Sequence, residues 1–227
     1  MTTDSAVHPL AALDALAART DLIAHHAAAV RTSVELVAGV RPADLRLPTP
    51  CADWTLHGLL THSVAQHLGF AAAVRGDGDP AAWKVRPLGA DPAGEYLAAA
   101  EAVLAAFAEP GVSARRVPLV EFGGEFSGAQ AVCFHFVDYV VHAWDIARTL
   151  GLPVRFDDRV LAAAYEVAAV VPGGAARTAP GSAFGPEVPW SGADGLDRVV
   201  ALLGRDPRWR GRPGLGLGSA TTAWPPA

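Results

Sequence analysis

The sequence predicts an all-α protein, a helical bundle followed by a short irregular C-terminal strap. Three observations lead to this fold class. Apolar residues recur at helical spacing over most of the chain, Pro- and Gly-rich links separate these stretches, and the composition turns to Gly, Pro, Ser and Ala after Pro172. Since 227 residues suffice for one substantial core with a small appendage, we expect a bundle over residues 1–172 and a packed extension over 173–227.

The first two helices are predicted from spacing and capping. Apolar residues from Leu10 to Val37 recur at close to helical intervals, and Pro42 ends the run, which indicates one long helix. A loop with three prolines follows. Thr55 is placed to cap a second helix that runs to about Val74.

The middle of the chain contains a third helix and a short irregular segment. Residues 94–107, GEYLAAAEAVLAAF, have strong intrinsic helix propensity, and Pro110 and Gly111 stop the pattern. Residues 112–125 are predicted to be short and extended or irregular. This segment therefore separates the third helix from the next one.

The fourth and fifth helices complete the bundle. The fourth runs from about Ser127 to Leu150, with Gly151 directly after its end. The fifth, DDRVLAAAYEVAAVV, is capped by Asp157 or Asp158. Four long helices are enough for a bundle, so one of the five is extra. In the extension we expect one short helix near residues 196–203, a packed strap and then a loose end.

Charge and composition exclude several classes of partner. The net charge is −5 and the eighteen basic residues are scattered, so nucleic acid is not an expected partner. No basic head precedes an apolar run and no window reaches eighteen apolar residues, so we expect a cytoplasmic protein without a membrane partner. Two cysteines do not make a disulfide framework. Monomer and homodimer both remain open.

The fourth helix carries an unusual polar stripe in an apolar setting. His135, Asp138, His142 and Asp145 are spaced three or four residues apart, so at about 100° per residue they lie on one side of the helix. Polar groups inside a bundle core are costly unless they are hydrogen-bonded or coordinate a cation. The stripe therefore indicates either a hydrogen-bonded network or a metal site.

The second helix offers one histidine toward that stripe. Its predicted apolar face consists of Leu59, Leu60, Val64 and Leu68. His62 lies near the edge of this face, whereas His57 and His67 are five residues away on either side, about 140° around the helix, and should point elsewhere.

We predict that His62, Asp138 and His142 are the metal ligands. A zinc-like ion accepts imidazole nitrogen and carboxylate oxygen, and a catalytic site takes about three protein ligands while leaving a position for water or substrate. The alternative at this stage is a hydrogen-bonded Asp138–His142 pair without a metal.

His135 and Asp145 are the remaining candidates for catalytic roles. Asp145 could orient a metal ligand, or it could form an ordinary salt bridge with Arg148. His135 could shuttle protons or contact substrate, or it could be a packed, hydrogen-bonded imidazole. Cys51 has no basic neighbour in sequence, so we expect it to be packed rather than nucleophilic.

Several segments together resemble a known family. LPTPCADWTLHGLLTHSVAQH is followed by FVDYVVHAWDIARTLG, then by FGPEVPW and LDRVVALLGRDPRW. In this order they resemble the DinB-like superfamily, in particular the actinobacterial branch similar to mycothiol-dependent maleylpyruvate isomerase. The resemblance implies a four-helix bundle that holds a divalent metal through one histidine of the second helix and an acid and a histidine of a later helix. Here these are His62, Asp138 and His142.

The chain departs from the isomerase in two places. Asp138 stands where we expect the isomerase to have Glu, and the segment after Pro172 is too short for the isomerase's separate C-terminal domain. These differences put the isomerase's substrate in doubt but not the metal.

The resemblance implies a metal-dependent enzyme that uses a low-molecular-weight thiol. We expect mycothiol as co-substrate, a small electrophile as substrate, and isomerisation or S-transfer as the reaction. Zinc is the first choice of metal, with nickel or manganese as alternatives. The competing hypothesis is a helical bundle that binds a metal or a small molecule without catalysis. A catalytic site keeps an open coordination position, whereas a structural site is closed by a fourth protein ligand, for which His135 is the nearest candidate.

Overall fold

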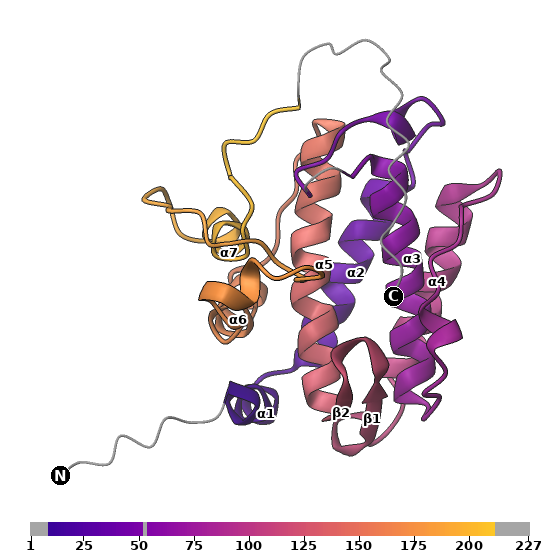
Figure 1. Cartoon of the computed structure of the whole chain (residues 1–227), viewed down its shortest axis with the longest axis vertical. Coiled ribbons are helices and arrows are strands. Elements are labelled where there is room, and N and C mark those ends of the chain that lie inside the picture. The colour runs from indigo at the N-terminus through magenta and orange to yellow at the C-terminus, as the bar shows by residue number, and fades with distance from the viewer. Residues whose placement is uncertain (1–8, 52–53, 212–227) are drawn as a thin grey trace.

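The computed structural model describes residues 9–51 and 54–211, and these are mostly helical with one small hairpin. Figure 1 shows long helices side by side, with shorter helices against one flank and the hairpin at one end. The predicted all-α bundle is confirmed. No helix of the described residues is both long and apolar enough to cross a membrane.

The single helix predicted over residues 10–37 is wrong, because two helices occupy this range. They are α1 (Pro9–Arg19) and α2 (Leu22–Val37). The break falls at Asp21, whose side chain accepts a hydrogen bond from the backbone N–H of Ala24 at 3.0 Å and so caps the new helix. The apolar spacing hides the break because α1 buries leucines and α2 buries leucines and valines in the same core.

The next two helices match their predictions. Helix α3 (Leu56–Val74), predicted above as the second helix, begins at the Thr55 cap, whose hydroxyl accepts a hydrogen bond from the Gly58 N–H at 3.3 Å. Helix α4 (Pro92–Phe107), predicted above as the third helix, starts slightly earlier than predicted because Asp91 caps it and proline is favourable in a first helical turn.

A two-stranded hairpin follows α4 where a short extended or irregular segment was predicted, so the extended alternative holds there. Strands β1 (Arg116–Leu119) and β2 (Gly124–Ser127) are antiparallel, with Leu119 opposite Gly124. A 3₁₀ turn, Val120–Phe122, and Gly123 at a φ of 70° join them. The hairpin leads directly into the longest helix.

That helix, α5 (Gly128–Leu150), has the predicted termini. Ser127 and Gln130 form a reciprocal capping box at its start, and Gly151 ends it with a φ of 68°. Two shorter helices follow, α6 (Asp158–Ala169) and α7 (Leu196–Leu202). Short 3₁₀ segments lie at Asp44–Arg46, Pro80–Trp83, Val112–Ala114 and Gly174–Arg177.

Four helices form the bundle proper. Helix α2 packs along α5 and α3 packs along α4, while α2 also contacts α4 and α3 contacts α5. Helices α1, α6 and α7 pack against the flank of α5, as Figure 1 also shows. The line where α3 meets α5 carries the polar residues singled out above.

The segment after Pro172 is held by a buried arginine. The Arg177 guanidinium donates to the backbone carbonyls of Pro172 at 2.9 Å and Val171 at 3.2 Å, and it also reaches Leu202. In α7, Val199 and Val200 are fully buried. The predicted packed strap is therefore present up to residue 211, and the predicted loose end lies outside the described residues.

Three histidines form a chain in the middle of the bundle. His135 of α5 lies between His26 of α2, with 2.8 Å between ring nitrogens, and His67 of α3, at 3.2 Å. All three are fully buried, and Phe107 and Tyr139 pack against them. Burial lowers the pKa of His26 to about 3, and burial with the charges of neighbouring histidines lowers the pKa of His67 and His135 well below the ordinary value.

The histidine chain should make the fold sensitive to acid. Because these imidazoles stay neutral in the folded state but accept protons near pH 6.5 when unfolded, their contribution is complete above that pH and falls below it. As the pH falls below about 6.5, each of these three histidines should lower the free energy of unfolding by about 1.4 kcal/mol per pH unit. Urea unfolding of wild type and His26→Leu at several values between pH 5 and 7.5 should give a slope that is shallower in the variant by about one proton. Equal slopes would contradict this assignment, and His57→Asn serves as a half-exposed control.

Candidate metal centre

The facing sides of α3 and α5 bring three potential metal ligands together. One donor atom each from His62, Asp138 and His142 lies within 4.8 Å of the other two. His62 comes from the first half of α3, whereas Asp138 and His142 are one turn apart on α5. The rings of His62 and His142 meet edge to face, 5.6 Å between centroids.

His142 is held so that one nitrogen faces the other ligands. Its Nδ1 lies 3.1 Å from Asp145 Oδ2 and donates its proton there, which leaves the lone pair on Nε2. That Nε2 lies 3.3 Å from Asp138 Oδ1. Two acceptors at this separation repel each other unless a proton or a cation lies between them. The distance also suits two ligands of one tetrahedral ion, which lie about 3.3 Å apart for bonds of about 2.0 Å.

Asp145 is supported in turn by an arginine of the C-terminal extension. Arg205 donates to both carboxylate oxygens of Asp145, with Nη2 to Oδ2 at 3.1 Å and Nε to Oδ1 at 3.4 Å. Asp145 is fully buried and Arg205 nearly so. Burial would raise the pKa of Asp145, but the charges of Arg205 and His142 outweigh it and the pKa is lowered. Asp145 is therefore an anion fixed behind His142.

The charges in the site favour a cation. Burial lowers the pKa of His62 to about 3, helped by the charges of His142 and Arg205, so this imidazole is neutral and free to coordinate. Burial raises the pKa of Asp138. Burial opposes protonation of His142, but the charges of Asp138 and Asp145 raise its pKa. The carboxylates on either side of His142 therefore favour a positive charge between them.

Trp54 and Cys51 lie beside His62 and Arg205, respectively. The Trp54 ring packs against His62 at 4.7 Å between centroids. Arg205 Nη2 also donates to Cys51 Sγ at 3.1 Å. Burial raises the pKa of the Cys51 thiol to about 12, so Cys51 is a neutral thiol, in agreement with the packing role expected for it.

Other predicted residues lie away from these ligands. His67 does point away from His62, but into the core rather than out of the bundle. There its Nδ1 pairs with His135 Nε2. Leu68, predicted to lie on the apolar face, is 43% exposed. Arg148 bonds Asp197 at 3.5 Å and not Asp145. Both ring nitrogens of His135 face His26 and His67, so none is directed at the metal ligands.

The network beyond His142 was only partly visible in the sequence. The i, i+3 spacing of His142 and Asp145 predicts their contact. Arg205 lies 60 residues further along the chain, and neither periodicity nor spacing connects it to Asp145. The one available signal is its position directly after the apolar short helix, in LDRVVALLGRDPRW.

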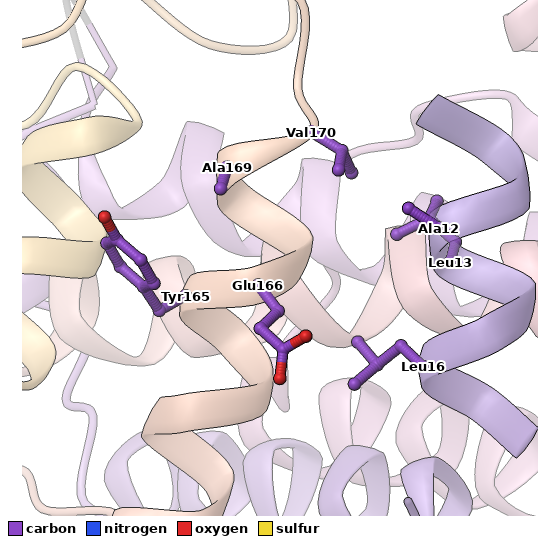
Figure 2. Close-up of a pocket in the computed structure, with 7 residues that line it drawn as sticks. All are labelled: Ala12, Leu13, Leu16, Tyr165, Glu166, Ala169 and Val170. Carbon is purple, nitrogen blue, oxygen red and sulfur yellow. The ribbon is translucent and has the colours of Figure 1, made fainter. Parts of the chain in front are cut away.

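Two surface hollows of the described residues lie elsewhere. One, of about 230 Å³, lies between α1 and α6, and Figure 2 shows Leu16 and Glu166 facing each other across it. A second, of about 280 Å³, lies on the other side of Tyr165 toward Arg198. None of the candidate metal ligands lines either hollow, and the donor geometry is the stronger indication of a functional site.

Fold and site together define a helical-bundle protein with a His–Asp–His cluster on facing helices whose geometry could hold a metal ion. Residues 26–147 match the family model of the mycothiol maleylpyruvate isomerase N-terminal domain. The chain belongs to this family. It is also 31% identical over 191 residues to uncharacterized proteins of Mycobacterium tuberculosis strains CDC 1551 and H37Rv, covering 83% of this chain and all of each relative. No solved structure matches the chain significantly.

The ligand set predicts metal content directly. Purified protein should carry about one divalent ion per chain, and His62→Ala and His142→Ala should each lose most of it, because two ligands hold an ion far less tightly than three. Elemental analysis after gel filtration measures this. His57→Ala is the matched control on the same helix and should keep wild-type metal. Wild-type content in both ligand variants would show that the site is elsewhere.

Asp145 should affect metal affinity without touching the metal. Asp145→Asn keeps the shape but weakens the acceptor for His142 Nδ1–H, so the metal dissociation constant should rise about tenfold to a hundredfold. Competition with a chromophoric chelator measures it. Asp194→Asn, a surface acid paired with Arg198 at 2.6 Å, is the control. An unchanged affinity in Asp145→Asn would leave the Asp145–His142 contact with a purely structural role.

Proposed function

We propose that this protein is a metal-dependent enzyme that activates a low-molecular-weight thiol, mycothiol in first place, for S-transfer to a small electrophile or for its isomerisation. The observation that carries the proposal is the three-donor set of His62, Asp138 and His142, of which His142 is oriented by a buried carboxylate. Membership of the mycothiol-related family supports the choice of thiol.

The donor set fits a divalent cation. Two neutral imidazoles and one carboxylate suit zinc, with nickel and manganese as alternatives, and they leave the ion a net positive charge. When bound, such a cation would lower the pKa of a thiol and hold the thiolate. The protein's own contribution is to keep His62 neutral, to direct His142 Nε2 toward the site and to supply the charge of Asp138.

An open coordination position favours catalysis over a purely structural metal. Closing the site requires a fourth protein ligand, and His135 was the nearest candidate in the sequence. Its two ring nitrogens are already 2.8 and 3.2 Å from His26 and His67. Within residues 9–51 and 54–211, the three-donor group contains no fourth member. Among the described residues no fourth protein donor competes for the coordination position that the proposal assigns to a thiol.

The competing function is a bundle that holds a metal or small molecule without turnover. The same donors would serve it, so turnover must be measured. Metal-loaded protein should consume mycothiol in the presence of a suitable electrophile from a panel, with the product mass recorded by mass spectrometry. Metal binding without thiol consumption across mycothiol, glutathione and bacillithiol would favour the non-catalytic bundle.

The Asp138 series tests how charge and activity are connected. Asp138→Asn removes the one charged ligand and should weaken metal binding about a hundredfold, whereas Asp138→Glu should be milder because the bundle wall can absorb one methylene. Thiol consumption should follow metal occupancy across the series, and excess metal should partly restore the Asn variant. A fully metallated but inactive Asn variant would instead make Asp138 a general base.

A further inference from the structure

The helix pair that holds the metal ligands continues past them in a regular register. His62 meets His142, the Tyr139 hydroxyl donates to the Ser63 carbonyl, and His67 lies against His135, so α3 and α5 run antiparallel. One turn beyond His62 on α3 is Gln66, and one turn before His142 on α5 is Asp138. In an antiparallel pair these two residues fall at the same level, so Gln66 lies level with the candidate ligand Asp138.

Gln66 connects this level to the hairpin. Its side chain is nearly buried, and its Nε2 donates to Glu121 Oε2 at 2.8 Å. Glu121 lies in the 3₁₀ turn between β1 and β2, and the residue as a whole is exposed although its carboxylate is partly buried against Gln66. Burial and the charge of Asp138 both raise the pKa of Glu121, which indicates that the two carboxylates share one electrostatic environment.

The turn that carries Glu121 is fixed to the same two helices. The neighbouring Phe122 stacks on Phe134 of α5, with centroids 5.2 Å apart and planes 12° apart, and also meets Phe70 of α3 at 6.0 Å. Phe126 of β2 packs against Phe134 as well. These ring contacts hold the hairpin turn against α3 and α5, and the hydrogen bond from Gln66 holds the Glu121 carboxylate beside α3.

We infer that Glu121, held by Gln66, is a specificity-determining residue that selects thiols carrying a hydrogen-bond donor or a positive charge and disfavours thiols carrying a carboxylate. This inference rests on the proposed function, because it assigns the polar end of a ligand whose sulfur occupies the metal centre. A carboxylate accepts hydrogen bonds from hydroxyl and ammonium groups and repels anions.

The other charges around the site support the same selection. Asp138 and Asp145 are acidic, and Arg205 is engaged with both oxygens of Asp145. Arg148 is occupied by Asp197. Both arginines are therefore already paired with carboxylates. We assign to Glu121 the contact with the second group of the thiol.

Three small thiols that differ in their second group provide the test. Cobalt-loaded protein is titrated at one fixed pH with 2-aminoethanethiol, 2-mercaptoethanol and 3-mercaptopropionate, and binding is followed by the thiolate-to-cobalt charge-transfer absorption. The measured quantity is the ratio of the dissociation constants of 3-mercaptopropionate and 2-aminoethanethiol. Comparing this ratio between variants cancels the intrinsic difference between the two thiols.

Glu121→Gln should reduce the ratio about tenfold, because the amide keeps the shape and the hydrogen-bonding oxygen but removes the charge. The control is Glu125→Gln on the same hairpin, an exposed acid paired with Arg116 at 2.8 Å, which should leave the ratio at its wild-type value. Gln66→Leu should shift the ratio in the same direction as Glu121→Gln, since the carboxylate loses its anchor.

The outcomes separate this inference from the proposed function. Equal ratios in wild type and Glu121→Gln, with clear thiolate absorption in both, would overturn the role of Glu121 and leave thiol activation intact. A ratio that falls equally in Glu125→Gln would also overturn it, since the effect would then come from general surface charge. Absence of thiolate absorption with all three thiols in metal-loaded wild type would remove the proposed function and this inference together.

Discussion

The antiparallel packing of α3 on α5 is the constraint on which the rest of the structure depends. This line buries imidazoles and carboxylates, and each needs a partner because an unpaired polar group in a core costs about 1–3 kcal/mol. Some contacts cross the line: the His142 ring packs against His62, Tyr139 donates to the Ser63 carbonyl, and a His135 nitrogen pairs with His67. The hydrogen-bond partners of His142 and Asp145 are instead Asp145 and Arg205, respectively. A slip of α3 by one turn would break all three contacts together, so the metal-ligand geometry and the core are fixed by the same register.

The C-terminal extension stabilises the same helix pair, because its Arg205 pairs with the buried Asp145 of α5. A buried Asp145 without a counter-charge would cost several kcal/mol, and Arg205 supplies that charge from beyond α7. Arg205 is positioned because Val199, Val200 and Leu203 bury the short helix. The buried strap thus positions Arg205, Arg205 fixes Asp145, and Asp145 orients the His142 imidazole. Loss of the strap should disturb the metal centre before it disturbs the four-helix core.

Residues that act through local periodicity were predictable from the sequence, and residues that act through long-range contacts were not. Thr55, Ser127 and Gly151 mark helix ends by chemistry that depends on a few neighbouring residues. Asp138 and His142 share a face by spacing alone. By contrast, Arg205 and Glu121 reach the centre through tertiary packing of segments with weak local preference, and Asp21 breaks a helix whose apolar pattern continues across it. His62, Asp138 and His142 were joined across two helices only because resemblance and helical geometry selected the same residues.

The same bundle thus contains two histidine groups with opposite chemistry, and their difference lies in the neighbouring charges. His26, His67 and His135 have aromatic neighbours and each other, so their pKa values are lowered, and both nitrogens of His135 pair with one nitrogen each of His26 and His67. His142 lies between two carboxylates, which raise its affinity for a proton and, by the same field, for a metal cation. The neighbouring charges therefore favour a cation beside Asp138 and His142 rather than in the histidine chain, although the histidine chain contains more imidazoles.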